Sequence, residues 1–284
     1  MNKALRGGKP GFFPGIVFLA LALPGSAVLA AASAQKNGQP SLADILKRAA
    51  AYCQKLESAS LYYVCEEDIS EKINFQTGTG TGISSLPGRS FNTWVYDYQL
   101  IRMGAVFTER RDLLKKNGRA MKVTDAELET RRFSHKFVIF GPVGLFGGKC
   151  QRNFHYEFVK EEPVNRAMAY VIDVTPGPTA PPRALYGRAW LKADDSSVLE
   201  IQWDQASMEN FLEIQRAAAE IETRPQIVFV SEYAFEKNGL RFPSHYAVEE
   251  SYVRENSVTP RARSITTVIY KNYRFFTVEV DVRD

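Results

Sequence analysis

The feature that most constrains the fold of this chain is a two-residue alternation of apolar and polar side chains over many short segments. Residues 92–103, NTWVYDYQLIRM, put four large side chains on one face: Trp94, Tyr96, Tyr98 and Leu100. Residues 198–203 repeat the pattern with Leu199, Ile201 and Trp203. Because successive side chains of a β-strand point to opposite faces, each segment predicts a strand with one buried face.

Similar segments recur along most of the chain and are separated by turn signals. The predicted strands are 61–75, 92–103, 106–116, 154–158, 168–174, 185–192, 198–203, 227–236, 241–253, 264–270 and 274–282. Asn117-Gly118 and Asn238-Gly239 are hairpin signals, and residues 193–197 form a further hairpin loop. About ten strands joined by short turns predict an antiparallel meander.

Two segments have helical rather than strand character. Ser41, with Asp44 three positions later, starts an amphipathic helix that should run to about Ser58. Residues 207–221 are rich in helix formers and predict a second helix that Pro225 ends. A twisted sheet of about ten strands must curl, split or close. The predicted fold is therefore mainly β (α+β), an open half-barrel wrapped around the first helix and the second, inserted one.

One apolar, glycine-rich segment, FVIFGPVGLFGG at residues 137–148, has no clear period. It is either a buried crossover between strands or a mobile apolar lip at the mouth of a pocket, and long loops of this kind are often functional.

The N-terminus predicts export. Lys3, Arg6 and Lys9 precede an apolar run over residues 15–31, and Ala32-Ser33-Ala34 provides a small-residue cleavage signal. We expect a signal peptide at 1–34, one domain at 35–284, and a periplasmic or secreted protein. The alternative is an uncleaved membrane anchor, since about 17 apolar residues can just span a bilayer.

Charge excludes a nucleic-acid partner once the signal peptide is removed. The chain has 36 Lys and Arg against 32 Asp and Glu, and residues 1–34 contain three of the bases and none of the acids. The mature protein is nearly neutral, so it lacks the basic footprint of a nucleic-acid-binding protein. The basic pairs at 110–111, 115–116 and 131–132 are interleaved with acids and are expected to be solvated.

The three cysteines predict one disulfide. Cys53 lies on the apolar stripe of the first helix and Cys65 on the apolar face of the following strand, so the two thiols face each other if the strand folds back beneath the helix. In an oxidising compartment such a pair forms a disulfide. The alternative is two separate buried thiols. Cys150 is then left over as a free thiol in a loop.

No pattern in the chain predicts catalysis, a metal site or a cofactor. His135, His155 and His245 are scattered, without spacing suited to zinc, and are expected on the surface or on strand faces. The carboxylate pairs at 66–67 and 249–250 lie in alternating segments, so the two members of each pair face opposite ways. The TGTGTG stretch at 77–82 precedes no helix and predicts a hairpin tip rather than a phosphate cradle.

The chain as a whole resembles the outer-membrane lipoprotein-sorting and lipoprotein-carrier family. The resemblance rests on SLADILKRAAAYCQKL and LYYVCEEDISEKINF at the front, YGRAWLKADDSSVLEIQW in the middle, and SEYAFEKNGLRFPSHYAVEESY with YKNYRFFTVEVDV at the end. It implies a half-barrel wrapped around helices that carries acyl chains across the periplasm, with extra material in this chain around residues 104–150.

These observations predict a non-enzymatic protein that binds a lipid or a lipoprotein acyl chain on the concave face. The expected cavity wall consists of Trp94, Tyr96, Tyr98, Leu100, Trp203 and Phe211. Any of these aromatics could instead belong to a packed core, since protein interiors are close-packed. The alternative function is a protein-interaction or envelope-sensing module without a cavity. Both classes allow transient contact with a membrane or an envelope protein.

Overall fold

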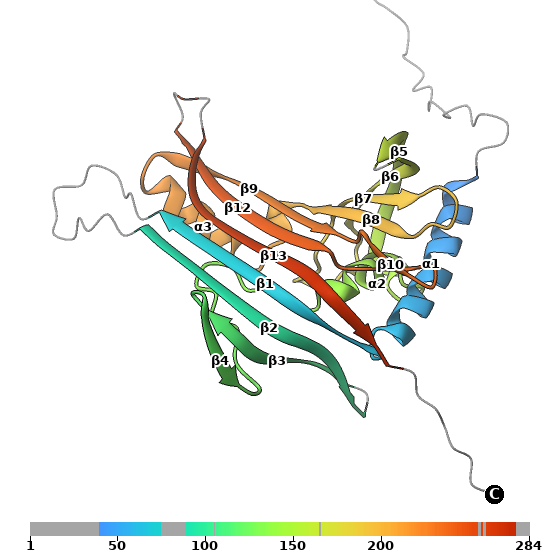
Figure 1. The fold of residues 1–284 in the computed structure, drawn as a ribbon. Coiled ribbons are helices and arrows are strands. Elements are labelled where there is room, and N and C mark those ends of the chain that lie inside the picture. Colours follow the sequence, from blue (N-terminus) through green and yellow to red (C-terminus); the bar gives the residue numbers. More distant parts are fainter. Residues whose placement is uncertain are drawn as a thin grey trace, which may run out of the picture. The chain divides into compact units, whose positions relative to one another are not determined.

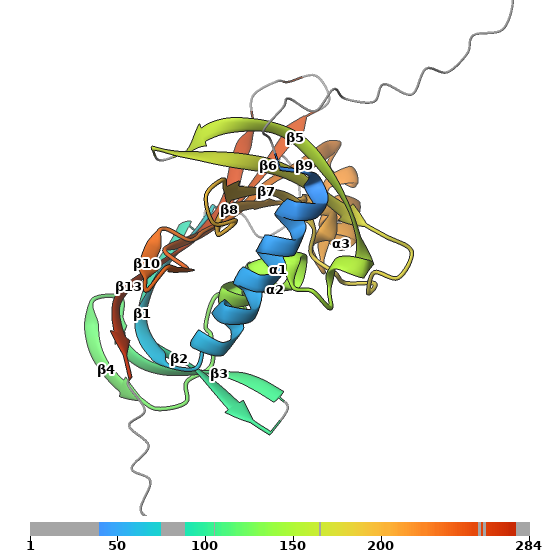
Figure 2. The same ribbon diagram turned by 90° about the vertical axis from the view of Figure 1, so that its right-hand side faces the viewer.

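An antiparallel sheet of 11 strands dominates the structure, a computed structural model that describes residues 40–74, 89–104, 106–164, 166–254, 257 and 260–276. The strand order is β4-β3-β2-β1-β13-β12-β9-β8-β7-β6-β5, so the sheet is open, with β4 and β5 as its edges (Figure 1). Figure 2 shows the sheet curving around α1 and α2. The predicted fold class, a mainly β open half-barrel with helices, is confirmed.

The chain builds this sheet from two meanders. The first consists of β1 (Tyr63–Asn74), β2 (Arg89–Met103), β3 (Val106–Lys116) and β4 (Arg119–Val123). The second consists of β5 (Phe154–Val164), β6 (Ala167–Pro176), β7 (Gly187–Lys192), β8 (Val198–Trp203), β9 (Thr223–Glu232), β12 (His245–Arg254) and β13 (Arg261–Phe275). Pairing of β1 with β13 joins the two. The chain must therefore pass from β4 at one edge of the sheet to β5 at the other.

The N-terminal helix forms as the sequence predicts. α1 spans Leu42–Ala59, and Ser41 and Asp44 make a reciprocal capping box at its start. Its buried side chains are Ile45, Ala49, Tyr52, Cys53 and Leu56, the helical stripe that faces the core.

The remaining helices are short. They are α2 (Gly141–Phe146), α3 (Phe211–Ala219) and the 3-10 turns η1 (Val138–Phe140), η2 (Gln151–Asn153) and η3 (Gln205–Ser207). The predicted second helix is thus shorter than residues 207–221, and it ends at Ala219 rather than at Pro225, which lies inside β9. α3 packs against β9, whereas the helix that shares the concave side with α1 is α2.

Both Asn-Gly turns have the predicted backbone. Asn117 and Gly118 have φ of 49° and 77°, and Asn238 and Gly239 have φ of 53° and 73°. Two consecutive positive φ values are what a tight hairpin turn requires. The second turn joins β10 (Phe235–Lys237) to β11 (Leu240–Phe242), a separate two-stranded sheet.

Other predictions fall elsewhere or need correction. No turn separates the last two predicted strands, 264–270 and 274–282. Residues 261–275 form one strand, β13, which pairs with β12 and β1. The signal peptide, the TGTGTG stretch and residues 277–282 lie outside the described residues. Among the helices that are described, none combines the length and the apolar character needed to cross a membrane.

Candidate functional site

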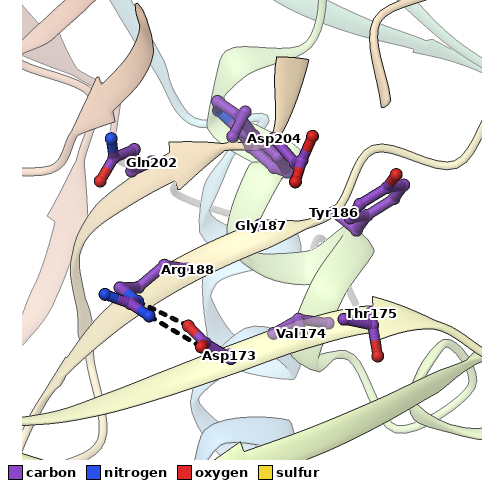
Figure 3. Close-up of a pocket in the computed structure, with 9 residues that line it drawn as sticks. Asp173, Val174, Thr175, Tyr186, Gly187, Arg188, Gln202 and Asp204 are labelled. Atoms are coloured by element: carbon purple, nitrogen blue, oxygen red, sulfur yellow. Dashed lines mark hydrogen bonds and ion pairs between the residues drawn. The ribbon is translucent and has the colours of Figure 1, made fainter. Parts of the chain in front are cut away.

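A pocket of about 290 Å³ lies at one end of β6, β7 and β8 (Figure 3). Arg188 makes a two-pronged ion pair with Asp173, with N–O distances of 2.6 and 2.8 Å. The other residues that line the pocket are Val174, Thr175, Tyr186, Gly187, Gln202, Trp203 and Asp204. The half-buried Arg188–Asp173 pair neutralises itself, which leaves Asp204 as the charge in the lining that is not in an ion pair.

The segment that links β4 to β5 is the more informative feature, because it crosses the concave face of the sheet. We call residues 124–136 the strap and residues 137–146 the cover. The strap has no helix or strand, whereas the cover contains η1 and α2. A connection this long with so little regular structure is unusual in a compact domain and is typical of functional loops.

Under the strap, the inner face of the sheet is charged. Glu67 on β1 is fully buried and pairs with Arg111 on β3 through two contacts of 2.6 and 3.1 Å. His135 of the strap places Nε2 at 3.2 Å from the same carboxylate. The Arg111 guanidinium also lies over the ring of Tyr98, at 5.1 Å from its centroid. The first cluster thus joins two strands to the strap.

Two more buried carboxylates hold the strap directly. Glu71 accepts hydrogen bonds of 2.9 Å from the backbone N–H groups of Arg131 and Arg132. The Arg132 side chain then pairs with Glu250 on β12, which also accepts a 2.8 Å hydrogen bond from the Ser264 hydroxyl. We call Glu67, Glu71, Arg111, Arg132, His135 and Glu250 the charged inner site.

The electrostatics of this site keep two of its carboxylates, Glu67 and Glu250, ionised. Burial alone would raise the pKa of Glu67, but the charges of His135 and Arg111 and their hydrogen bonds outweigh it and lower that pKa to about 2. Burial likewise opposes ionisation of Glu250, and hydrogen bonds from Arg132 and Tyr252 lower its pKa. The charged inner site therefore anchors the strap and is a poor surface for an acyl chain.

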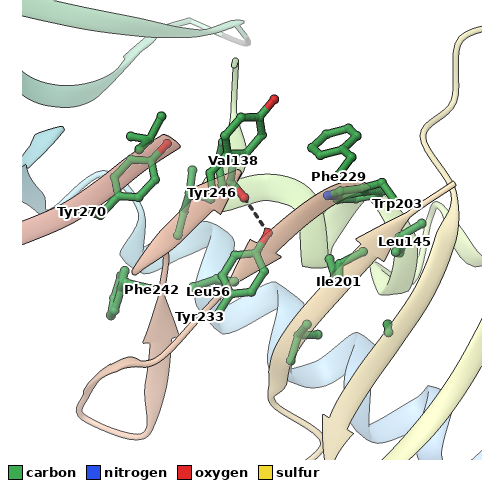
Figure 4. Packing of buried hydrophobic residues seen from close by; sticks show 14 of the residues in the cluster. Leu56, Val138, Leu145, Ile201, Trp203, Phe229, Tyr233, Phe242, Tyr246 and Tyr270 are labelled. Carbon is green, nitrogen blue, oxygen red and sulfur yellow. Dashed lines mark hydrogen bonds between the residues drawn. The ribbon is translucent and has the colours of Figure 1, made fainter. Parts of the chain in front are cut away.

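Under the cover, the inner face is aromatic (Figure 4). We call Trp203, Phe229, Tyr233 and Tyr246 the apolar inner site. The rings of Trp203 and Phe229 lie 5.7 Å apart, and those of Phe229 and Tyr246 lie 5.3 Å apart. All four residues are at most 6% exposed. The site is closed because the cover lies on it.

The cover is held by close packing and a few polar contacts. The Tyr233 hydroxyl donates a 2.8 Å hydrogen bond to the Val138 carbonyl. A Cβ at Gly141 would lie 2.4 Å from the Tyr233 oxygen and 3.1 Å from the Trp203 ring, so only glycine permits this approach. Val138, Ile139, Pro142, Leu145 and Phe146 are buried. Of the two interpretations of residues 137–148, this closed structure matches the buried crossover.

The predicted wall residues are divided between these surroundings. Trp94, Tyr96, Tyr98 and Leu100 share the inner face of β2 and are buried, as the alternation predicted. Tyr96 donates a hydrogen bond to the Glu127 carbonyl of the strap, and Tyr98 donates one to Glu109. Only Trp203 lies in the apolar inner site, while Phe211 lies on α3 and is partly buried. Their role as a ligand-binding wall stays a prediction.

The predicted disulfide between Cys53 and Cys65 is not found, and both are buried free thiols. β1 starts near the C-terminal end of α1 and runs away from it rather than back beneath it (Figure 1). The Cys53 sulfur lies 3.3 Å from the Pro142 carbonyl of α2. Burial raises the pKa of Cys65, whose neighbours include Glu67 and Tyr273. The third thiol, Cys150, is also free and is partly exposed.

The charged inner site was missed by sequence reasoning, and two expectations are corrected by it. Arg111 is buried and Arg132 is partly buried rather than solvated, and His135 is buried rather than on the surface. The partners of each carboxylate pair do face opposite ways, but Glu67 and Glu250 face inward. The sequence did contain a signal for the inward carboxylates. Glu67 and Glu71 have odd numbers like Cys65, Ile69 and Ile73, so a strand places all five on the same, buried face.

A scan against protein-family models found no match, and a search of curated proteins found none. Similar solved structures include a DUF1329 family protein from Desulfovibrio piger, with 11% identity, TM-score 0.38, and coverage of 83% of this chain and 95% of that one. An outer membrane lipoprotein-sorting protein domain from Vibrio parahaemolyticus has 9% identity, TM-score 0.38, and the same coverages, 83% and 95%. A LolA superfamily protein from Nitrosomonas europaea has 9% identity, TM-score 0.32, and coverages of 84% and 94%.

The second of these structures carries the name of the lipoprotein-sorting group that the sequence resembles. Likenesses with TM-scores this low do not establish a function.

Proposed function

We propose that this protein is an exported, non-enzymatic binder of an apolar ligand, a lipid or a lipoprotein acyl chain, which it takes up in the apolar inner site when the cover moves. The observation that carries the proposal is the contrast between the two halves of the concave face. The strap is fixed by buried ion pairs, whereas the cover is an apolar segment packed on an aromatic surface. Lifting the cover would expose that surface, and an acyl chain could restore its burial at about 25 cal/mol per Å².

The alternative, a protein-interaction or envelope-sensing module, is favoured by one specific observation. Every residue of the apolar inner site is already buried by the chain itself, so the described structure needs no ligand to complete its core. In that case the cover is part of a permanent core, and partners bind elsewhere.

Probe binding separates the two functions. Delipidated protein should bind a dansyl-labelled fatty acid saturably and release it to phospholipid or to an acylated peptide. The Tyr233→Phe variant removes the hydrogen bond to the Val138 carbonyl and should take up the probe several-fold faster. Tyr273→Phe is the matched control, because the Tyr273 hydroxyl donates to the Pro243 carbonyl, away from the cover. Each variant should lose about 1 kcal/mol of stability.

If folded, delipidated wild type and Tyr233→Phe both take up no probe, the lipid-binding proposal is wrong and the interaction module replaces it. Equal acceleration of uptake in both variants would show that general loosening, rather than the cover, controls entry.

A further inference from the structure

The pocket at the end of β6, β7 and β8 is a second candidate site (Figure 3). Two rows of its lining residues cross the three strands: Asp173, Arg188 and Gln202 in one, and Thr175, Tyr186 and Asp204 in the other. The Asp204 N–H donates a 2.8 Å hydrogen bond to the Tyr186 carbonyl, which sets these two side chains next to each other. Because side chains alternate along a strand, both rows point away from the concave face, on which Trp203 packs under the cover.

The second row has hydrogen-bonding capacity that the chain does not use. Asp204 Oδ1 accepts a 2.8 Å hydrogen bond from the Ala206 N–H. Within the part of the chain that the structure describes, Asp204 Oδ2 and the Tyr186 hydroxyl have no hydrogen-bond partner. Burial raises the pKa of Tyr186, and the Asp204 carboxylate raises it further, so this phenol stays neutral. The pocket therefore offers a ligand one free carboxylate oxygen beside an aromatic ring.

The charges around the pocket favour a cationic ligand. Asp204 has no cation partner, and Glu157 of β5 lies opposite Asp173 on the adjoining strand. Glu200, two residues before Gln202, is on the same face of β8. The bases of these strands are each paired with an acid: Arg188 with Asp173, and Lys160 with Glu162.

An organic cation fits this lining better than a metal ion does. Among the described residues, no three acidic, histidine or cysteine side chains are grouped so that they could hold a metal. An ammonium group, in contrast, can pair with Asp204 while its methyl or methylene groups lie on the negative face of the Tyr186 ring.

We propose that this pocket binds an organic ammonium group, held by the free oxygen of Asp204 and by the ring of Tyr186. The volume of about 290 Å³ is near the lower end of the range for ligand pockets, so the ligand is a small amine or the head group of a larger molecule. This site is separate from the proposed acyl-chain site, because the two lie on different faces of the sheet.

Ligand-observed NMR titration of the purified full chain tests the proposal. The probes are choline and its uncharged isostere, the alcohol in which carbon replaces the nitrogen of choline. We expect the isostere to bind at least about tenfold more weakly than choline, because it keeps the shape and loses the charge. Equal binding of the two probes, or no binding of choline, would overturn the proposal.

Variants assign the binding to the two named side chains. Asp204→Asn keeps a side-chain oxygen for the Ala206 N–H and removes the charge, so choline should bind about tenfold more weakly. Asp194→Asn is the matched control, since Asp194 is an exposed acid in the turn at the other end of β7 and β8, and it should leave choline binding unchanged.

Tyr186→Leu removes the ring and should weaken choline binding several-fold, whereas Tyr186→Phe keeps the ring and should bind choline as wild type does. Far-ultraviolet circular dichroism checks that each variant is folded. Choline binding that neither Asp204→Asn nor Tyr186→Leu weakens would contradict the assignment of the pocket.

A further titration distinguishes the two sources of the ammonium group. Glycerophosphocholine binding at least as tightly as choline would support the proposal with a phospholipid head group as the ligand. Binding of choline without binding of glycerophosphocholine would support it with a free amine as the ligand. Neither result depends on the acyl-chain proposal, because these probes carry no acyl chain and the fatty-acid probe carries no choline.

Discussion

At the scale of single residues, the buried carboxylates distinguish this half-barrel from one lined only by apolar side chains. Glu67 and Arg111 are 0% and 7% exposed in their side chains, so neither charge can be solvated if its partner is lost. Such a pair contributes little net stability relative to apolar residues, but breaking it leaves an unpaired buried charge. The role of the pair is therefore to fix where the strap and β3 lie.

Removing one member of this pair should be costly. Arg111→Met should lower the free energy of unfolding by about 3–5 kcal/mol, because it leaves Glu67 ionised and buried. The control is Arg183→Met, since Arg183 and Glu209 form an ion pair with 77% and 69% exposed side chains, and it should change stability by less than about 1 kcal/mol. Urea unfolding measures both. The double variant Glu67→Met, Arg111→Met should be more stable than Arg111→Met alone, because it leaves no unpaired charge. A double variant less stable than Arg111→Met would show that the unpaired Glu67 charge is not the cause of the loss.

At the scale of elements, strands and turns were predictable and the crossing segment was not. Alternation and Asn-Gly pairs are local signals, so β2, β8 and the 238–239 turn lie where the sequence predicts. The strap has no period, and its conformation depends on carboxylates that lie about 60 and 118 positions away in sequence. The predicted disulfide between Cys53 and Cys65 was wrong for a similar reason, because packing rather than local sequence sets the angle between α1 and β1.

Two glycines of the cover test how tightly it packs. Gly141→Ala puts a methyl group against the Tyr233 hydroxyl and the Trp203 ring and should cost about 1–3 kcal/mol. Gly144→Ala, in the same helix, meets nothing within 4 Å and should be neutral or stabilise by up to about 1 kcal/mol. Thermal unfolding of the two variants gives the comparison. Equal stability of the two would show that the cover does not rest on the aromatic surface in solution.

At the scale of the whole described unit, the strap ties strands from both meanders, since Glu67 and Glu71 lie on β1 and Glu250 lies on β12. Acid should therefore loosen the sheet and the strap together. The pKa of Glu67 is about 2 in the folded state against 4.5 as its ordinary value, so the folded protein binds fewer protons between these values than the unfolded chain does. The stabilisation is fully present above about pH 4.5 and is lost as the pH falls toward 2.

This shift amounts to about 3 kcal/mol at roughly 1.4 kcal/mol per pH unit, and Glu250, whose pKa is also lowered, adds in the same direction. Urea unfolding from pH 6 to pH 2.5 should show stability falling with acid. Glu67→Gln should be less stable than wild type at pH 6 and should lose less on acidification, so that the two curves converge. Parallel curves for wild type and Glu67→Gln would mean that the Glu67 carboxylate does not hold the strap to the sheet.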